Sequence, residues 1–425
     1  MIDPAQDLDQ TCDVLIEGGA VRELGTSIEA GDAEVIDAKG LVVCPGLVDM
    51  HVHLREPGRE DEETIESGAR AAIHGGFTSV AAMPNTEPTI EGEEGVKFVL
   101  GKAAEAGLAR VFPVAAISKR QKGETLSEIG SAIRAGAVGI SDDGYPVAQS
   151  GLMRRALEYV KMFDRPVMAH CEDTGLSAGG VMNEGRTSTV LGLRGIPGAS
   201  EDVEVIRDII LTRLTGSRLH VCHVSTAASL GFIEQAKTSG LNVTCEVTPH
   251  HLTLDDEAVA TFDTNTKMKP PLRRKHDVSA LRKGIETGVV DAIASDHAPH
   301  SPEEKDQEFD LAPFGIIGLE TTVGIVMTRL YHEGAVTLSN LIRLLSTNPA
   351  RILGLPLGSL KPGSPADVTL LDPDSEWEVD PRDFVSKSRN TPFSGWSVKG
   401  KAITVIVEGR VLMRDGELKT PGVRP

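Results

Sequence analysis

The sequence has few aromatic residues, few cysteines and no long apolar run. Aromatic side chains make up 4% of its 425 residues, and no apolar run reaches membrane-spanning length. No basic-then-apolar leader opens the chain. The five cysteines are unpaired in spacing and lie mostly in apolar strand-like runs; they are Cys12, Cys44, Cys171, Cys222 and Cys245. This pattern favours reduced, buried thiols over a disulfide framework and predicts a cytoplasmic protein without a membrane partner.

Positive charge is also scarce. The chain carries 43 Lys and Arg against 62 Asp and Glu, which gives a formal net charge of −19. Such a balance argues against nucleic acid and anionic membranes as partners. An anionic substrate would therefore need a local cationic clamp. The remaining composition, 40% hydrophobic and 25% charged, is ordinary for a globular protein, and the length allows a large core.

The middle of the chain alternates short strand-like runs with amphipathic helix-like runs. We expect strands near residues 47–53, 78–83, 110–117, 137–143, 166–170, 218–223, 242–248 and 290–296. In the intervening segment 61–76, the residues that fall on one helical face are Ile65, Ala69, Ala72 and Ile73. Eight such units predict an α/β fold, a (β/α)₈ TIM barrel, whose active sites lie at the C-terminal ends of the strands.

Side chains alternate between the two faces of a strand, which predicts where polar residues point. In the first strand His51 and His53 share a face, so both can reach one metal ion. In the fourth strand Asp142 shares a face with apolar residues that should pack under helices. We therefore expect Asp143, and not Asp142, to point into the barrel.

Three more residues of the same chemical type end other strands, namely His170, His223 and Asp296. Six His and carboxylate side chains without a thiolate suit zinc or a similar divalent metal, and they exceed what one open tetrahedral ion needs. Two metal ions that share one carboxylate is the economical interpretation. A single strand histidine is more often a hydrogen-bonded core residue, but unpaired His and Asp converging at one mouth would be costly to bury.

Other His and Cys residues near these positions are interpreted as structural. Cys171, Cys222 and His220 adjoin the candidate ligands but fall on the opposite strand faces. His250 and His251 follow the seventh strand and could support the ligands, although a structural role is favoured.

The two ends of the chain do not follow the βα rhythm. Short strands are expected at Cys12–Glu17, Glu34–Asp37, 364–372 and 402–414. We predict a small β-sandwich formed by residues 1–45 and 358–425, next to a barrel formed by residues 46–357. The opening Met1–Pro4 resembles the tail of a hairpin from which one strand is missing.

Seven short motifs follow one another along the chain. They are Asp49–Gly58 (DMHVHLREPG), Ala82–Thr86 (AMPNT), Ser141–Gly144 (SDDG), Ala169–Asp173 (AHCED), His220–Ser225 (HVCHVS), Ala294–His300 (ASDHAPH) and Pro313–Glu320 (PFGIIGLE). In this order they resemble the dihydroorotases of the long bacterial type, within the amidohydrolase superfamily. A lone His-X-His is weak evidence, but the ordered series is specific and the resemblance covers nearly the whole chain.

The resemblance implies a two-zinc site and a catalytic residue. One zinc ion would lie near His51, His53 and Asp296, the other near His170 and His223, and Asp143 would bridge the two. Many relatives give this bridging role to a carboxylated lysine. Asp296 would also act as catalytic base and acid.

The resemblance also implies a set of substrate contacts. They are Arg55 and Asn85 on the substrate carboxylate, with His300 and the backbone near Phe314 and Gly315, and the position of Lys269. Family members often carry Asn where this chain has Lys269, just before Pro-Pro-Leu-Arg, so this ring contact differs.

The activity implied is the reversible, zinc-dependent cyclisation of N-carbamoyl-L-aspartate to L-dihydroorotate and water, in pyrimidine biosynthesis. Opening the ring amide needs an activated water, a polarised carbonyl and a proton for the departing nitrogen. Arg55 is the most diagnostic residue, because guanidinium forms a bidentate clamp on a carboxylate. The alternative for Arg55 is a structural salt bridge with Glu56 or Glu62.

Two other functions remain as alternatives. A hydantoinase, dihydropyrimidinase or allantoinase would typically bridge its metals with a carboxylated lysine, and a neutral substrate would leave Arg55 unexplained. A metal-free homologue that serves as a structural subunit for aspartate transcarbamoylase usually lacks some ligands, whereas every ligand position is filled here. We expect a homo-oligomer, a dimer, and aspartate transcarbamoylase is a further partner to test.

Overall fold

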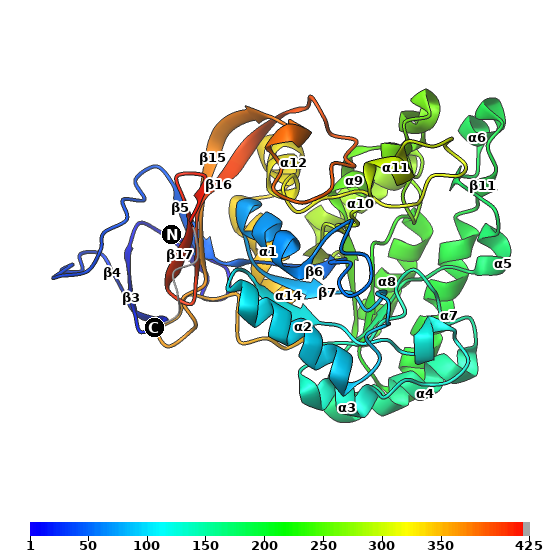
Figure 1. Cartoon of the computed structure of the whole chain (residues 1–425), viewed down its shortest axis with the longest axis horizontal. Helices are drawn as coiled ribbons and strands as arrows, with labels where there is room; N and C mark the ends of the chain where they lie inside the picture. The colour runs from blue at the N-terminus through cyan, green and yellow to red at the C-terminus, as the bar shows by residue number, and fades with distance from the viewer. Residues whose placement is uncertain (420–425) are drawn as a thin grey trace.

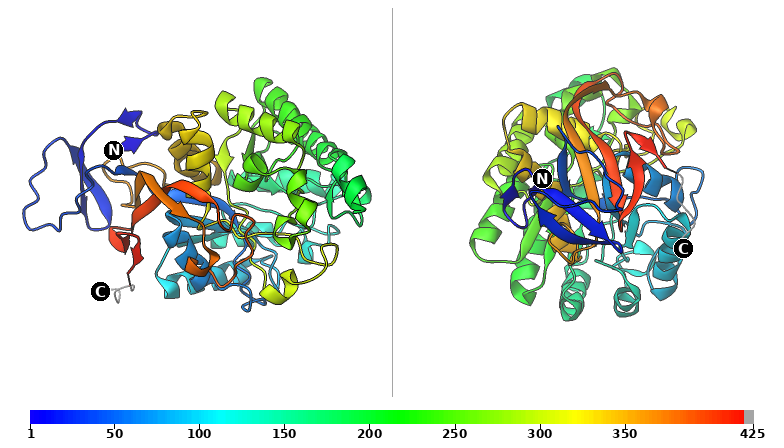
Figure 2. Two further views of the ribbon diagram at one scale, coloured as in Figure 1. Left: turned by 90° about the horizontal axis from the view of Figure 1, so that it is seen from above. Right: turned by 90° about the vertical axis from the view of Figure 1, so that its left-hand side faces the viewer.

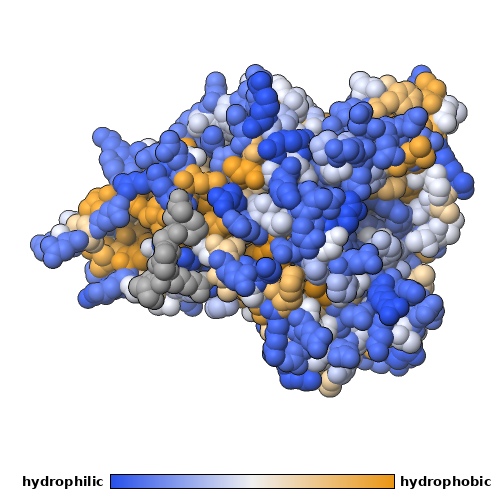
Figure 3. All heavy atoms as spheres, in the orientation of Figure 1, coloured by the Kyte–Doolittle hydropathy of each residue, from blue (hydrophilic) through white to orange (hydrophobic). Residues whose placement is uncertain are grey.

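The computed structural model describes residues 1–419 and contains a barrel with a separate group of strands at one end (Figure 1). None of the helices in this part of the chain combines the length and hydropathy required to cross a membrane. Polar residues cover much of the face shown in Figure 3, and apolar ones gather over the terminal strands at its left.

Seven parallel strands form two sheets of the barrel. One sheet contains β6 (Leu47–Val52), β7 (Phe77–Ala82) and β8 (Arg110–Pro113). The other contains β9 (Val167–Ala169), β12 (Leu219–Val221), β13 (Val243–Val247) and β14 (Ala292–Ile293). Single bridges close the ring, from Ala115 to Ile140, from Ile140 to Val167 and from Val52 to His297. The predicted TIM barrel is therefore confirmed.

The predicted fourth strand, 137–143, is reduced to its bridging residue Ile140. Two features of the sequence explain this. Gly139 weakens a strand because it has no side chain to pack. The carboxylate of Asp142 accepts the backbone N–H groups of Ile117 and Ser118 at 2.8 and 3.0 Å, which takes these donors out of the ladder.

Helices cover the outside of the barrel (Figure 1). The longer ones are α1 (Ile65–His74), α2 (Glu93–Ala106), α3 (Ile129–Ala135), α4 (Ser150–Val160), α7 (Ala199–Thr215), α8 (Ala227–Thr238) and α10 (Lys275–Thr287). The start of α1 is fixed by a capping box between Thr64 and Ser67. The predicted apolar face of α1 is confirmed, since all four of its residues are buried.

Shorter elements lie between these helices and strands. They are α5 (Thr174–Ser177), β10 (Met182–Asn183), α6 (Arg186–Leu191), β11 (Gly195–Ile196), α9 (Pro249–Thr253), α11 (Pro302–Lys305), α12 (Thr322–Val326), α13 (Leu338–Ile342) and α14 (Asn348–Leu353). A π-helical turn, 327–332, continues α12.

Both ends of the chain contribute to one antiparallel sheet. Its order is β18 (Glu417–Leu418), β17 (Arg410–Arg414), β16 (Ser397–Val407), β15 (Val368–Glu378) and β5 (Val42–Pro45). The hairpin of β3 (Asp13–Glu17) and β4 (Ala20–Gly25) joins it through a bridge from Ala20 to Pro365. Figure 2 shows the strands of both termini together at one end of the molecule. The exact division at residues 45 and 358 stays a prediction.

One expectation for the N-terminal region is wrong. Glu34–Asp37 forms no strand, because it is largely exposed to solvent and no described segment pairs with its backbone. Ile2–Asp3 (β1) pairs with Leu8–Asp9 (β2) in a short antiparallel hairpin.

Two glycine-to-alanine variants test how tightly the end of α1 packs against the segment that leads into α12. A Cβ atom on Gly75, the C-cap of α1, would lie 2.0 Å from the backbone oxygen of Leu319. We expect Gly75→Ala to lower the free energy of unfolding by about 1–3 kcal/mol, because backbone must move. Gly101→Ala in α2 is the control, since nothing lies within 4 Å of its Cβ position. It should stabilise by about 0.5–1 kcal/mol. Denaturant unfolding measures both, and equal effects would contradict the tight fit.

Candidate metal centre at the mouth of the barrel

The six candidate ligands all lie at or just beyond the C-terminal ends of barrel strands. His51 belongs to β6 and His53 follows it. The other four follow the bridging residue Ile140, β9, β12 and β14; they are Asp143, His170, His223 and Asp296. Each is at most 8% exposed, so their polar atoms depend on one another rather than on water.

Asp143 is the centre of this cluster. Its Oδ1 atom lies 3.4 Å from His51 Nε2, from His170 Nδ1 and from His223 Nε2. Its Oδ2 atom lies 3.4 Å from His53 Nε2. One carboxylate therefore contacts four imidazoles that come from three different strands.

Asp296 completes one side of the cluster. Its Oδ1 atom lies 3.1 Å from His53 Nε2 and 3.5 Å from His51 Nε2. On the other side, His170 Nδ1 and His223 Nε2 lie 3.0 Å apart. The cluster thus has two halves, with two imidazoles in each and Asp143 common to both.

The spacing of these atoms fits divalent metal ions. Two ligand atoms about 2.0–2.1 Å from a tetrahedral zinc ion lie about 3.4 Å apart, close to the separations found here. His51 Nε2 is also buried and makes no hydrogen bond within the described residues. A buried imidazole nitrogen aimed at two carboxylates is the donor that such an ion requires. The residues present therefore fit a divalent metal centre.

Carboxylates behind the histidines fix the direction in which the rings point. Glu246 of β13 is fully buried and lies 2.7 Å from His51 Nδ1 and 3.1 Å from His220 Nε2. A proton on His51 Nδ1 leaves the lone pair of Nε2 facing Asp143. His220 thus has the structural role expected of it, because its ring contacts the second carboxylate oxygen of Glu246.

The other two anchors come from the motifs themselves. His53 Nδ1 lies 2.7 Å from Asn85 Oδ1, and His170 Nε2 lies 3.2 Å from Glu172 Oε2. Asn85 was expected to contact substrate; in this structure it holds a histidine ring. Each ring again presents its second nitrogen to Asp143.

The charges of the cluster are strongly coupled. Although burial opposes ionisation, His51 and the hydrogen-bonded His170 and His223 hold the pKa of Asp143 well below its usual range. Burial likewise opposes protonation of His170, but the hydrogen bonds that its ring donates to the carboxylates of Asp143 and Glu172 raise its pKa to about 9. Because a metal ligand must be deprotonated, a bound cation competes with these protons.

Backbone strain is concentrated at the same place. Arg55, His223 and Asp296 have φ angles of 60°, 32° and 49°, in the left-handed region that non-glycine residues rarely adopt. Residues are held in such conformations where the surrounding structure over-determines them, which is common at functional sites.

Arg55 lies at the mouth, next to the cluster. Its Nε atom donates to the backbone oxygen of Pro299 at 3.0 Å and lies 3.0 Å from Glu62 Oε2. The salt bridge considered as the alternative for Arg55 is therefore present. These contacts use the Nε edge of the guanidinium group, and Nη2 lies 3.4 Å from His300 Nε2.

The remaining expected substrate contacts surround Arg55. His300 Nε2 donates to the backbone oxygen of Phe314 at 2.8 Å, and its Nδ1 atom lies 3.1 Å from Glu62. Gly315 has a φ of 126°, and a Cβ there would lie 2.7 Å from Ala298 Cβ, so the position requires glycine.

Lys269 belongs to the other half of the cluster. Its Nζ atom lies 3.0 Å from Glu172 Oε1 and 5.3 Å from the ring centre of Phe314. Through Glu172 it is linked to His170. The structure therefore brings all of the predicted site residues to one end of the barrel.

Three carboxylates were not predicted as site residues. Glu246, Glu172 and Glu62 are each at most 5% exposed, and each contacts one or two of the predicted residues. A signal was present for Glu246, which is the lone charge in the apolar strand Val243–Val247. Glu62 was indicated only by its spacing from Arg55, as one of two possible ion-pair partners, because it stands in a run of acidic residues typical of a solvated surface.

The remaining residues near the cluster agree with structural roles. Burial raises the pKa of the Cys171 and Cys222 thiols, so both are protonated core groups. Burial also lowers the pKa of His250 to about 4. His251 contacts Thr248 Oγ1 at 2.8 Å and the backbone oxygen of Pro270 at 3.0 Å.

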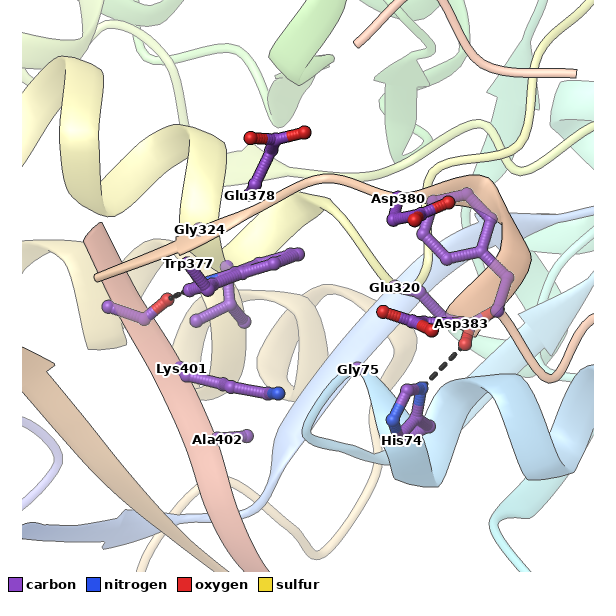
Figure 4. A pocket seen from close by; sticks show the side chains of 13 residues that line it. His74, Gly75, Glu320, Gly324, Trp377, Glu378, Asp380, Asp383, Lys401 and Ala402 are labelled. Atoms are coloured by element: carbon purple, nitrogen blue, oxygen red, sulfur yellow. Dashed lines mark hydrogen bonds and ion pairs between the residues drawn. The ribbon is translucent and has the colours of Figure 1, made fainter. Parts of the chain in front are cut away.

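A pocket of about 200 Å³ lies elsewhere, between the end of α1, the start of α12 and the strands β15 and β16 (Figure 4). There His74 Nδ1 contacts Glu320 Oε1 at 2.6 Å, and Trp377 donates to the backbone oxygen of Gly400 at 3.0 Å. None of the predicted site residues lines this pocket. It is therefore separate from the cluster around Asp143.

The family-model and sequence comparisons both match this chain to dihydroorotases. The family model described as Dihydro-orotase-like matches residues 40–229. A protein named dihydroorotase from Pelotomaculum thermopropionicum is 52% identical over 415 residues, which cover 98% of this chain and 97% of that protein. The dihydroorotase of Geobacter metallireducens is 51% identical over 415 residues, with 97% and 98% covered.

Solved structures with the same fold are named hydantoinases and dihydropyrimidinases. The L-hydantoinase of Arthrobacter aurescens superposes with a TM-score of 0.87 at 26% identity and covers 99% of this chain and 95% of its own. The dihydropyrimidinase of Brevibacillus agri NCHU1002 gives 0.84 at 25% identity, with 98% and 94% covered.

The anchoring of His51 can be tested through Glu246. We expect Glu246→Gln to weaken the affinity for divalent zinc about 10–100-fold, because the amide turns one N–H group against a ring N–H. Competition with a chelating dye measures this affinity. Glu234→Gln on the exposed side of α8 is the matched control and should leave it unchanged. Equal affinity of the Glu246 variant and the wild type would show that the ring is held without this carboxylate.

Proposed function

The chain belongs to the dihydroorotase family, and we propose that the cluster around Asp143 is the site at which it interconverts N-carbamoyl-L-aspartate and L-dihydroorotate. The protein is a cyclic amidohydrolase of pyrimidine biosynthesis. The observation that carries the assignment of the site is the contact of one buried carboxylate with four imidazoles at the mouth of the barrel.

We propose two zinc ions as the cofactor. His51, His53 and Asp296 hold one, His170 and His223 hold the other, and Asp143 is shared. Bound zinc supplies Lewis acidity, which polarises a carbonyl group and makes water more acidic. The anchors Glu246, Asn85 and Glu172 would keep the rings of His51, His53 and His170 aimed at the ions.

Asp296 is proposed to move the proton. Although burial opposes it, the charges of His51 and His53 and the hydrogen bond from His53 keep the pKa of Asp296 low, so the carboxylate is ionised and can accept. In ring opening it takes a proton from the attacking water and delivers it to the ring nitrogen as the C–N bond breaks. In ring closure it takes the proton from that nitrogen and gives it to the departing oxygen.

Arg55 is proposed to bind the carboxylate of the substrate. Its Nε edge is held by Pro299 and Glu62, which leaves the terminal nitrogens for a bidentate contact. Asn85, His300 and the backbone at Phe314 and Gly315 complete this side of the site. The salt bridge to Glu62 and the clamp are compatible, because they use different edges of one planar group.

Lys269 is proposed to face the ring of the substrate from the opposite side. Its ammonium group forms an ion pair with Glu172, and Glu172 also contacts His170, so the position of the ammonium group is fixed relative to His170. Association of the chain with itself, or with aspartate transcarbamoylase, also remains a proposal.

Hydantoinase activity is the second candidate, and the observation that favours it is the fold shared with hydantoinases. Two features weigh against it. Full-length identity is about twice as high to dihydroorotases as to those structures. A neutral ring would also leave Arg55 without a carboxylate.

A direct assay separates these functions. The zinc-loaded protein is incubated with L-dihydroorotate, hydantoin and allantoin, and metal per chain is measured on the same sample. We expect turnover of L-dihydroorotate alone with up to two zinc ions bound. Removal of the metal with a chelator should abolish turnover and lower the melting temperature, and added zinc should restore both. Turnover of the neutral rings instead would contradict the role of Arg55, and absence of metal and activity would indicate a structural subunit.

The clamp itself can be tested with a charge-conserving change. Arg55→Lys keeps the positive charge and loses the fork, so we expect kcat/KM for L-dihydroorotate to fall about 10–100-fold, the value of one charged hydrogen bond. The zinc content should stay the same. Arg70→Lys on the exposed face of α1 is the matched control. Normal turnover of the Arg55 variant would rule out the clamp.

A further inference from the structure

The ring of His223 differs from the other three rings of the cluster in how it is held. His51, His53 and His170 each have a side-chain partner on the nitrogen that faces away from the cluster. The hydrogen-bonding contacts of the His223 ring within residues 1–419 all use Nε2, which lies 3.0 Å from His170 and 3.4 Å from Asp143. The orientation of this ring therefore depends on its backbone rather than on a side chain behind it.

The backbone at His223 is itself strained. Its φ of 32° lies in the left-handed region, where a residue with a side chain stays only if the surrounding structure holds it. Before it, Cys222 N donates to Ala169 O at 3.0 Å, and after it Val224 N donates to Glu246 O at 2.9 Å. These are bonds to the two neighbouring strands, β9 and β13. The chain then leaves the sheet, and the turn that follows is fixed by another group.

That group is the carboxylate of Glu201, in the first turn of α7. It accepts the backbone N–H groups of Ser225 and Thr226, each at 3.1 Å, and the hydroxyl groups of the same two residues. Glu201 is 3% exposed, and Ser225 is fully buried. Four donors from two consecutive residues thus converge on one buried carboxylate, starting two residues after His223.

A buried arginine completes this arrangement. The Nε atom of Arg273 donates to Ser225 Oγ at 3.0 Å, and its Nη2 atom lies 3.9 Å from Glu201. Its Nη1 atom donates to the backbone oxygen of Ile196 at 2.9 Å. The positive charge compensates the carboxylate, which would otherwise be costly to keep away from water. The turn after His223 is therefore enclosed by charged groups from two other segments, α7 and the chain just before α10.

We propose that Glu201 is a positioning residue for His223. By fixing the turn two residues later, it keeps His223 in the left-handed conformation that aims the ring at Asp143. The effect passes through the backbone, so one residue of an outer helix determines the geometry of the half of the cluster that contains His170 and His223. The inference rests on the proposed function, since it takes His223 as a zinc ligand.

The alternative is that Glu201 serves only to start α8, whose N-cap is Thr226. The neighbouring carboxylate already has that role, because Asp202 accepts the hydroxyl groups of Thr226 at 2.6 Å and of Ser229 at 2.9 Å. Of the two carboxylates, Glu201 is the one that also binds Ser225. A comparison of the two therefore distinguishes the start of α8 from the turn that precedes it.

The zinc affinity of the whole protein, measured by competition with a chelating dye, tests the proposal. Glu201→Ala leaves two buried backbone N–H groups without their acceptor, so we expect one zinc affinity to fall about 10–100-fold, as for the loss of a group that orients a ligand. Glu201→Gln keeps one oxygen for these N–H groups and should lose less. Asp202→Ala is the matched control, which should lower the melting temperature but leave the zinc affinity unchanged.

A double-mutant cycle separates positioning from general destabilisation. His223→Ala removes the ring and should weaken zinc binding by itself. If Glu201 acts through this ring, Glu201→Ala should have no further effect in the His223→Ala background, whereas a purely structural effect would add. If Glu201→Ala does not fold, Glu201→Gln takes its place in the cycle. Unchanged zinc affinity in the Glu201 variants, or additive losses in the cycle, would overturn the proposal.

Turnover of L-dihydroorotate is measured on the same samples, so that the failure of either proposal can be recognised. A wild type that binds zinc without turnover contradicts the proposed reaction, and the cycle still decides the role of Glu201. A wild type that turns over, with His223→Ala retaining full zinc affinity, contradicts the ligand role of His223 and with it the positioning role of Glu201.

Discussion

The burial of the Asp143 carboxylate is the constraint on which the mouth of the barrel depends. A carboxylate that is 4% exposed must be compensated, and here four imidazoles from three strands do so. Three of those rings, His51, His53 and His170, are in turn oriented by Glu246, Asn85 and Glu172. The imidazoles satisfy the polar atoms of Asp143, and the residues behind these three rings satisfy their remaining nitrogens. The left-handed backbone at His223 and Asp296 is a further cost of bringing these groups together.

Much of this arrangement could be predicted from the sequence, because it follows from periodicity. Alternation along the predicted fourth strand distinguished Asp143 from Asp142. The structure places Asp143 in the cluster and Asp142 on backbone N–H groups, in agreement with that distinction, although only Ile140 of this strand takes part in a ladder. The buried face of α1 follows in the same way from a helical period. Barrel geometry then brings the strand ends together without any knowledge of the side-chain contacts.

What could not be predicted depends on contacts between distant segments. Spacing indicated Glu62, together with Glu56, as a possible ion-pair partner of Arg55, but the contact of Glu62 with His300 leaves no trace in an acidic run that resembles a surface. The shortening of the fourth strand depends on a side chain, Asp142, that competes for backbone donors of a neighbouring segment. Likewise, the local sequence of Glu34–Asp37 does not determine whether another strand lies beside it to form a ladder.

The pairing of β5 with β15 has a consequence for how the chain matures. Cys44, in β5, donates from its thiol to the backbone oxygen of Thr369, 325 residues later. β5 leads directly into β6, the strand that carries His51. During synthesis β5 therefore leaves the ribosome long before β15, the strand with which it pairs, has been made. The hairpins β1–β2 and β3–β4 can form at once, but β5 has to wait for most of the polypeptide. Until residue 368 and its neighbours are synthesised, β5 presents an open strand edge of the kind that favours non-native association.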